Sequence, residues 1–455
     1  MNSKSKDTLI VGLALFAMFF GAGNLIFPPT LGLLSGDKWF PAMLGFMLTG
    51  IGFPVIGVIA TAKAGGHIED LGDRVGKVFS KTLGLLIMLS IGPLLAIPRT
   101  AATTYEIGLR PLPINISPAV GSIIFFAIVL YFVLTPSKLI DRIGGVLTPV
   151  LIIVLSAMLV KSFIDPIGVP TDVNAVRTFK MGFEEGYQTM DAIGSIILTI
   201  VVIEGIKSKG YLEHRTILSM TIIAGIISAI GLSLVYGGFV YVGATTSSVV
   251  SSDMTRIELL NFIARSLWGS FGAIVLGIAV ALACLTTAIG LTATVGAFFS
   301  ELTKNKISYN AMVIGISVFS AVMATIGVDS IVSIAVPILV TIYPMTLVLI
   351  IMSLFDRFLN RASYIGAVLG AFIIGAIQGI SYTVPKVAAI LNAYFGHSVS
   401  YAFTNFFAVS KDFMNSLPFA ELGFAWLVPS LLLGLIFRFV SGFIYKSNNV
   451  TKSTF

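Results

Sequence analysis

Charged residues are scarce in this chain, since only 11% of its 455 residues are Asp, Glu, Lys or Arg, whereas 56% are hydrophobic. The mean hydropathy of +0.99 lies well outside the range of soluble globular proteins. Cys284 is the single cysteine, which excludes a disulfide framework and a cysteine-based metal site. The three histidines form no HExxH pattern, and no Walker A motif is present. We therefore expect neither a zinc enzyme nor an ATPase.

Long apolar segments, in contrast, are abundant. Runs of about 20 residues, each long enough to cross about 30 Å of hydrocarbon, recur along the chain and predict an all-α polytopic membrane protein. We expect about twelve spans and no separate soluble domain. Their predicted ranges are 8–34, 40–62, 80–105, 117–135, 143–164, 186–206, 216–243, 268–299, 309–327, 330–354, 363–381 and 421–443. The long segments 165–185 and 382–420 are expected to be outer loops, and residues 384–395 of the second one a candidate interfacial helix.

Basic residues indicate the orientation and the partners. Lys and Arg are more frequent in the loops on the same side as the N-terminus, which predicts cytoplasmic N- and C-termini in the plasma membrane. The net charge of +7 is spread over short loops and not gathered on one face, so we expect no nucleic-acid partner. The expected partners are a small-molecule substrate and the lipid bilayer. Nothing in the sequence requires an oligomer.

The first apolar segment contains residues that disfavour a continuous helix. In FFGAGNLIFPPTLG, residues 19–32, Gly21, Gly23 and the pair Pro28-Pro29 would each weaken or interrupt helical hydrogen bonding. Freed backbone groups are tolerated at membrane depth only where protein or a water-filled cavity receives them. We therefore expect this span to be broken near its middle. The alternative is a kinked helix whose glycines allow close packing.

A break here would create two opposed helix ends. The inner half would end near Phe20 with carbonyls suited to a cation. The outer half would begin near Asn24, as its N-cap, with amides suited to a carboxylate. Paired half-helix ends of this kind bind a coupling ion beside an anionic substrate group in many secondary transporters. The substrate-binding residues predicted here are Gly21, Ala22, Gly23 and Asn24.

Three motifs together resemble one family. MFFGAGNLIFPP at 18–29, LLAIPRTA at 94–101 and GYQTMDA at 186–192 are similar to the branched-chain amino acid carriers called BrnQ or LIVCS, and the likeness covers essentially the whole chain. The resemblance implies the fold of the amino-acid/polyamine/organocation superfamily, with twelve helices in the LeuT-like arrangement and broken helices 1 and 6. It also implies cation-coupled uptake of leucine, isoleucine and valine.

The LeuT-like arrangement implies two inverted repeats of five helices, followed here by two further helices. We expect residues 1–455 to form one transporter domain, with repeats at 8–164 and 186–354 and the additional helices at 363–443. Because a repeat with an odd number of spans ends on the opposite side, the second repeat enters inverted. The charge pattern agrees, since it places residue 8 inside and residue 186 outside.

The sixth span contains a carboxylate deep in an apolar segment. Asp191 is costly at this depth and is expected to face a cavity or a partner. It could hold a substrate ammonium group, carry a coupling proton, or balance the charge of Arg99. Thr189 and Ser195 are further candidates for substrate contacts, although both hydroxyls could instead bond to their own helix. The apolar residues at 94–102 and 189–197 would suit an aliphatic side chain, that of methionine included.

The eighth span offers a cluster of neutral oxygens. Ala283, Thr286 and Thr287 are spaced i, i+3 and i+4, so one carbonyl and two hydroxyls face the same point. In the fold that the chain resembles, these residues and the carbonyls aligned with Ala17 and Phe20 form a Na⁺ site between helices 1 and 8. The alternative is small-residue packing with the threonines bonded within their helix.

Arg99 is the basic residue that lies well inside a predicted span, and Asp191, Glu106 and Glu184 are its candidate partners. Structural ion pairing is the default interpretation, and a gating role is the alternative. Together these features predict a Na⁺-coupled symporter of branched-chain amino acids, with a H⁺-coupled carrier of other small apolar amino acids as the alternative. A channel or a membrane enzyme is less consistent, because no filter pattern or convergent acid, base and nucleophile set is visible.

Overall fold

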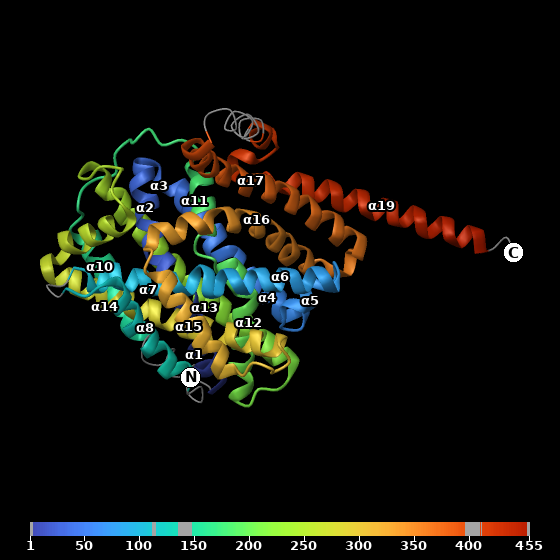
Figure 1. Cartoon of the computed structure of the whole chain (residues 1–455), viewed down its shortest axis with the longest axis horizontal. Coiled ribbons are helices and arrows are strands. Elements are labelled where there is room, and N and C mark those ends of the chain that lie inside the picture. The colour runs from blue at the N-terminus through green and yellow to red at the C-terminus, as the bar shows by residue number, and fades with distance from the viewer. Residues whose placement is uncertain (1–2, 112–114, 135–147, 396–409, 411, 453–455) are drawn as a thin grey trace. The chain divides into compact units, whose positions relative to one another are not determined.

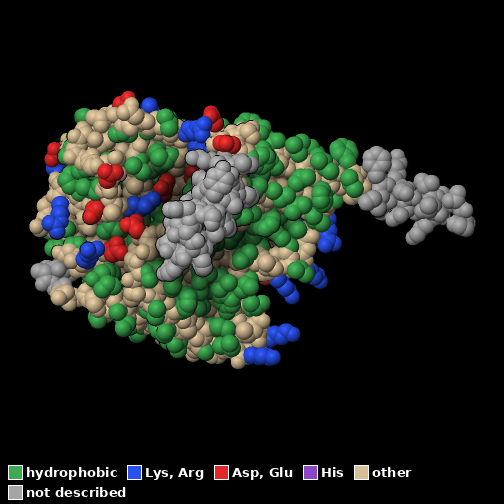
Figure 2. All heavy atoms as spheres, turned by 45° about the horizontal axis from the view of Figure 1, so that its top comes forward, with side chains coloured by type: hydrophobic (Ala, Val, Ile, Leu, Met, Phe, Trp, Pro, Cys, Tyr) green, Lys and Arg blue, Asp and Glu red, His purple; other side chains and the backbone are tan. Residues whose placement is uncertain are grey.

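The computed structural model describes residues 3–111, 115–134, 148–395, 410 and 412–452, and these are helical with connecting turns and contain no strand. They fall into two compact units, Met1–Gly66 with Leu85–Ala335, and His67–Gly84 with Val336–Phe455. The α-helices are labelled in Figure 1. Figure 2 shows hydrophobic side chains spread over the face in view, with charged side chains gathered in a few places.

The first unit contains the helices of the first nine predicted spans. They are α1 (Ser3–Phe19), α2 (Ala22–Ser35), α3 (Trp39–Met47), α4 (Phe53–Ala64), α7 (Ala96–Thr103), α8 (Pro118–Val133), α10 (Thr148–Ile164), α11 (Thr178–Tyr187), α12 (Asp191–Ser208), α13 (His214–Thr245), α14 (Arg256–Leu302) and α15 (Tyr309–Ala324). The second unit contains α5 (Ile68–Gly72), α17 (Arg361–Phe395) and α19 (Leu427–Lys452). The chain passes between the units within α6 (Lys77–Leu89) and α16 (Val328–Leu354).

Length and composition make these helices suitable for a membrane. Among the described residues, six continuous helical runs are long and apolar enough to cross one, and the bent pair α11 and α12, counted as one span, makes a seventh. Four shorter apolar helices lie at Pro118–Val133, Pro149–Ile164, Tyr309–Ala324 and Leu427–Gly442. Each predicted span thus coincides with helix over most of its described length, although residue 135 of the fourth and residues 143–147 of the fifth lie outside the described residues. The repeat boundaries at 8–164 and 186–354 stay a prediction.

The first span is broken, as predicted. Helix α1 ends at Phe19 and α2 begins at Ala22, within two residues of the expected positions. The N-cap, however, is Gly21 and not Asn24. The Oδ1 atom of Asn24 accepts a hydrogen bond from the backbone amide of Gly21 at 3.3 Å. The Pro28-Pro29 pair also does not end the helix, because α2 continues to Ser35.

Close packing of α2 on α13 surrounds the proline pair. A Cβ atom on Gly243 would lie 1.9 Å from the carbonyl oxygen of Pro29, and one on Gly32 would lie 1.9 Å from that of Val240. The two backbones therefore touch at both glycines. Protein, not lipid, covers this part of α2, which is the condition for tolerating proline in a membrane helix.

The sixth span is broken too, but it begins earlier than predicted. Helices α11 and α12 meet at a bend of 40°, and Met190 between them has a left-handed φ of 65°. Residues 178–185, expected to be loop, form most of α11. Backbone contact with α3 holds this half-helix, since a Cβ on Gly182 would lie 1.9 Å from the Ala42 oxygen and one on Gly45 would lie 2.1 Å from that of Phe179.

Other boundaries also differ from the expected ones, among them that of the twelfth span, whose helix α19 begins at Leu427 and not at residue 421. The eighth span is part of the longer α14, which continues across non-helical backbone at Trp268 and Gly269. In the second unit, α17 continues to Phe395, so residues 384–395 do not form a separate interfacial helix. Residues 396–409 and 411 of the predicted outer loop lie outside the described residues.

Candidate functional site

A cavity of about 30 Å³ lies where the two broken spans meet. Residues of both breaks line it, and so do Ile91, Ala96, Arg99 and Thr100 of the third span. In that span Gly92 and Leu95 depart from helical geometry before α7. The polar residues that line the cavity are Asn24, Arg99, Thr100, Thr189, Asp191 and Thr287. A cavity of this size has room for about two water molecules, so an amino acid can enter only if the lining moves.

Asp191 begins α12 and accepts hydrogen bonds from two other elements. Its Oδ2 atom receives one from the Nδ2 of Asn24 at 2.5 Å and one from the hydroxyl of Tyr236 at 3.4 Å. The Asn24 amide also contacts the Tyr236 hydroxyl. Asn24, Asp191 and Tyr236 are 2%, 5% and 0% exposed, so this network is shielded from solvent. It ties α2, α12 and α13 together around one buried carboxylate.

Tyr236 was not predicted from the sequence, because nothing in its apolar segment shows which face turns inwards. A buried tyrosine hydroxyl generally has a hydrogen-bond partner, which is the signal that could have suggested a polar contact in the seventh span.

The other predicted substrate-binding residues occupy different positions around the cavity. Gly21, Ala22 and Thr189 line it together with Asn24 and Asp191. The Thr189 hydroxyl donates to the Gly186 oxygen at 2.9 Å and accepts from the Asp191 amide at 3.3 Å, so it caps the break.

Gly23 and Ser195 are not among the described residues that line the cavity. Gly23 instead lies against a charged side chain, because a Cβ there would be 2.8 Å from the Nη2 atom of Arg99. The Ser195 hydroxyl donates to the Ala192 oxygen at 2.7 Å within its own helix.

Arg99 lies at the cavity and is 3% exposed. Its Nη1 atom donates to the carbonyl oxygen of Gln188, in the break of the sixth span, at 2.7 Å. Its guanidinium carbon lies 5.4 Å from the centre of the Phe27 ring. Of the three predicted partners, Asp191 lines the same cavity. Glu106 instead accepts a hydrogen bond from the amide of Val328 at 2.9 Å, and Glu184 lies 3.9 Å from Lys180. The contact with Gln188 was not predicted, because side-chain binding of a backbone carbonyl leaves no pattern in the sequence.

Three of the five predicted ion ligands, Ala17, Ala283 and Thr286, lie together where α14 crosses the end of α1. The Thr286 hydroxyl lies 3.5 Å from the Ala17 oxygen and donates to the Ala283 oxygen at 2.9 Å. The Thr287 hydroxyl lies 3.4 Å from the oxygen of Met18 and beside Gly21, whose Cβ would be 3.0 Å from it. Neutral hydroxyl and carbonyl oxygens therefore converge at the negative end of the α1 dipole, a donor set that suits a hard monovalent cation.

Phe20 is the remaining predicted ligand. It follows the end of α1, and its amide donates to the Phe16 oxygen at 2.8 Å. Its ring stacks on that of Tyr236 with centroids 6.2 Å apart. Among the described residues, no group of three or more His, Cys, Asp or Glu side chains could hold a metal ion.

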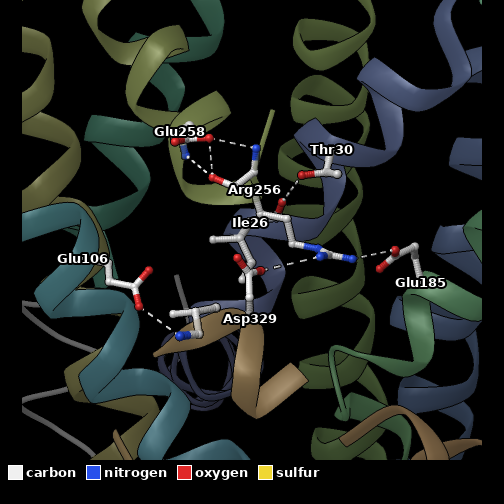
Figure 3. Close-up of polar contacts among 9 residues, drawn as sticks. Ile26, Thr30, Glu106, Glu185, Arg256, Glu258 and Asp329 are labelled. Carbon is white, nitrogen blue, oxygen red and sulfur yellow. Dashed lines mark hydrogen bonds and ion pairs between the residues drawn. The ribbon is translucent and has the colours of Figure 1, made fainter. Parts of the chain in front are cut away.

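A second charged cluster lies at the start of α14. Figure 3 shows Arg256 reaching Glu185 of α11 on one side and Asp329 of α16 on the other, with N···O distances of 3.1 and 3.8 Å. Arg256 also lies over the ring of Phe27, at 5.4 Å from its centre. This cluster was not predicted, because its members are far apart in the chain and lie near predicted loops.

The chain is similar in sequence to known transport proteins over nearly its whole length. A family model described as branched-chain amino acid transport protein matches residues 4–444. The chain is 36% identical to the branched-chain amino acid permease BraB of Bacillus subtilis, over 98% of both chains. It is 35% identical to the branched-chain amino acid transport system 2 carrier protein of Pseudomonas aeruginosa, over 94% of both.

Two solved structures resemble the fold. MhsT in complex with L-phenylalanine matches with a TM-score of 0.51 and 15% identity over 94% of this chain and 97% of that one. The inward-facing conformation of Mhp1 matches with a TM-score of 0.54 and 13% identity over 96% and 91%. At these identities the likeness shows the fold, which is the LeuT-like one with broken first and sixth spans.

Proposed function

Because the chain belongs to the family of branched-chain amino acid transport proteins, we propose that it is a secondary symporter that imports leucine, isoleucine and valine by alternating access, driven by a Na⁺ gradient. The family is one of membrane carriers, so the chain is an integral membrane transporter of amino acids and not an enzyme. The Na⁺ coupling and the three named substrates are the proposed part.

The observation that carries the proposal is the meeting of α14 with the end of α1. The hydroxyls of Thr286 and Thr287 lie 3.5 and 3.4 Å from two consecutive carbonyl oxygens of that helix end, Ala17 and Met18. These residues, with the carbonyl of Ala283 and the break at Phe20, would hold the ion. Thr287 and Gly21 also line the substrate cavity, so ion and amino acid would bind next to each other and stabilise the same arrangement of α1, α2 and α14.

The cavity supports a small amphiphilic substrate. Asp191 would face the ammonium group, and the amides at the start of α2 would face the carboxylate. Ile91, Ala96, Leu198 and Leu291 are the apolar residues of the lining that would meet an aliphatic side chain. Because the cavity holds only about 30 Å³, binding requires the lining to open and then close around the substrate, as alternating access demands.

Proton coupling is the second candidate, and one observation favours it. Asp191 is a buried carboxylate at the cavity, held by Asn24 and Tyr236, and such a group can take up and release a proton during a transport cycle.

Uptake into proteoliposomes separates the two couplings. Purified protein is reconstituted, the membrane potential is clamped with K⁺ and valinomycin, and either a Na⁺ or a H⁺ gradient is imposed. We expect labelled leucine to accumulate above its external concentration with the inward Na⁺ gradient alone. Accumulation with the H⁺ gradient alone would overturn Na⁺ coupling in favour of the alternative. Competition by unlabelled isoleucine, valine and methionine tests the proposed substrates.

The basic residues support the orientation that we propose for the chain in the membrane. The excess of Lys and Arg in the loops on the side of the N-terminus supports cytoplasmic N- and C-termini in the plasma membrane, and one chain holds all the proposed site residues, so the monomer would suffice. Labelling of Ser3→Cys and Ser447→Cys, each combined with Cys284→Ala and carried out in intact cells, tests this orientation, because both positions lie outside the predicted spans. Reaction with a membrane-impermeant maleimide from outside would contradict it.

A further inference from the structure

Arg99 is a buried basic side chain in the wall of the substrate cavity, and Asp191 is a buried acidic side chain in the same wall. We propose that Arg99 binds the carboxylate of the transported amino acid, beside the start of α2, while Asp191 takes its ammonium group. This inference rests on the proposed function and adds a specificity-determining residue from the third span.

Three elements hold the guanidinium in place. Arg99 lies in α7, one residue after Pro98 and shortly after the non-helical backbone at Leu95. The bond from Nη1 to the oxygen of Gln188 fixes one edge to the break of the sixth span at 2.7 Å. The ring of Phe27, 5.4 Å away, covers one side. A long side chain restrained in this way is preorganised to recognise a planar ligand group.

The surroundings of Arg99 favour an anion. Gly23 lies in the first turn of α2, and a Cβ there would be 2.8 Å from the Nη2 of Arg99, so the guanidinium lies directly against this helix start. The positive end of the α2 dipole and a positive guanidinium are then neighbours, and a negative group beside both of them is stabilised by both. A carboxylate also matches the fork of guanidinium N–H groups.

Asp191 completes a zwitterion site. It lies at the start of α12 and reaches α2 through the Asn24 amide at 2.5 Å, so both charged groups adjoin the same half-helix. An α-amino acid carries its ammonium and carboxylate groups on one carbon, and it needs opposite charges close together in its site. A neutral pair of buried charges, met by a neutral zwitterion, leaves no net charge at membrane depth.

A purely structural Arg99 makes a different prediction. If its function is only to support the break through Gln188, its loss weakens binding of every ligand in the cavity to a similar degree. If it binds the carboxylate, its loss changes the preference between ligands with and without that group. The informative quantity is therefore a ratio of affinities.

The test uses three ligands and competition with labelled leucine on the purified protein in Na⁺. L-leucinamide lacks the carboxylate charge, and 4-methylpentanoate lacks the ammonium group. In Arg99→Gln we expect the preference for leucine over leucinamide to fall by about tenfold or more, since the repulsion between Arg99 and the amide's lone positive charge is also removed. Arg99→Lys keeps the positive charge but loses the forked pair of N–H donors. Its preference for leucine over leucinamide should lie between that of Arg99→Gln and that of the wild type.

Two controls identify the cause. Arg256→Gln removes the other guanidinium that lies 5.4 Å from the Phe27 ring, and Arg256 does not line the cavity. The Arg256→Gln variant should therefore keep the wild-type preference for leucine over leucinamide. Asp191→Asn should reduce the preference for leucine over 4-methylpentanoate instead. An unchanged leucine-to-leucinamide ratio in Arg99→Gln overturns the proposal.

Folding of the variants does not block the test. If Arg99→Gln is not recovered folded, Asp191→Asn combined with Arg99→Gln removes both buried charges, and its ratio is compared with that of Asp191→Asn alone. An equal leucine-to-leucinamide ratio in these two proteins likewise overturns the role of Arg99. A wild-type protein that binds neither leucine, isoleucine nor valine contradicts the proposed function itself, which is a separate result.

Discussion

Removal of a hydroxyl from α14 should weaken the response to Na⁺ before it affects the amino acid. Thr286→Ala removes a hydroxyl that lies 3.5 Å from the Ala17 carbonyl oxygen at the end of α1. Thr287→Ala removes one that lies 3.4 Å from the carbonyl oxygen of Met18. Thr286 is 1% exposed, so water cannot readily replace its hydroxyl. A neutral polar contact of this kind contributes about 0.5–1.5 kcal/mol, which corresponds to roughly a 2- to 13-fold change in an equilibrium constant.

The assay is initial leucine uptake into proteoliposomes over a range of Na⁺ concentrations. We expect the Na⁺ concentration for half-maximal uptake to rise by that factor in each alanine variant, with a smaller change in the maximal rate. Thr286→Ser and Thr287→Ser retain the oxygen and should stay near the wild type.

Thr294→Ala is the matched control, because the Thr294 hydroxyl donates to the Gly290 oxygen at 2.8 Å within α14. Its loss should leave the Na⁺ dependence unchanged. If both Thr286→Ala and Thr287→Ala fold well and show the wild-type Na⁺ dependence, the proposed ion site is wrong.

Three further predictions concern the breaks and their packing. Asp191→Asn removes the charge and should raise the leucine Kd by about 5- to 160-fold, from the 1–3 kcal/mol of a charge-assisted hydrogen bond, and full activity of this variant from pH 5 to 8 would contradict a binding role. Gly21→Leu should abolish leucine binding without abolishing expression, because even a Cβ atom at this position would lie 3.0 Å from the Thr287 hydroxyl. A near-normal leucine affinity in this variant would mean that the carboxylate binds elsewhere. Gly243→Ala should lower the melting temperature, since its Cβ would lie 1.9 Å from the Pro29 oxygen, whereas Gly315→Ala, with open space around it, should not; equal melting temperatures would contradict the tight contact of α2 with α13.

Local chemistry explains which parts of the fold the sequence predicts well. Glycines that weaken a helix do so wherever they stand, so the break at Phe20 and Gly21 was expected within two residues. The proline pair in the same span has a different outcome because α13 packs against it, and no local pattern contains that contact. The early start of α11 has the same cause, since its backbone is held by glycine contacts with α3.

In the site, too, the sequence predicts some residues, whereas others are recognised only from tertiary packing. Asp191, Asn24 and Thr287 could be proposed from polarity inside apolar segments, and all three line the cavity. Tyr236 and Arg256 could not, because their importance comes from partners 45 and 71 residues away along the chain, respectively Asp191 and Glu185. Hydrophobic periodicity says that a residue lies in a helix, but only tertiary packing decides which groups it meets.

Equilibrium binding of leucine to the purified protein in Na⁺ and in K⁺, at equal ionic strength and pH, tests Na⁺ coupling most directly. If the ion binds where α14 meets the end of α1, raising Na⁺ should lower the leucine Kd, and saturating leucine should lower the Na⁺ concentration for half-saturation by the same factor. A leucine Kd that is the same in Na⁺ and K⁺ across the titration would contradict the proposed symport.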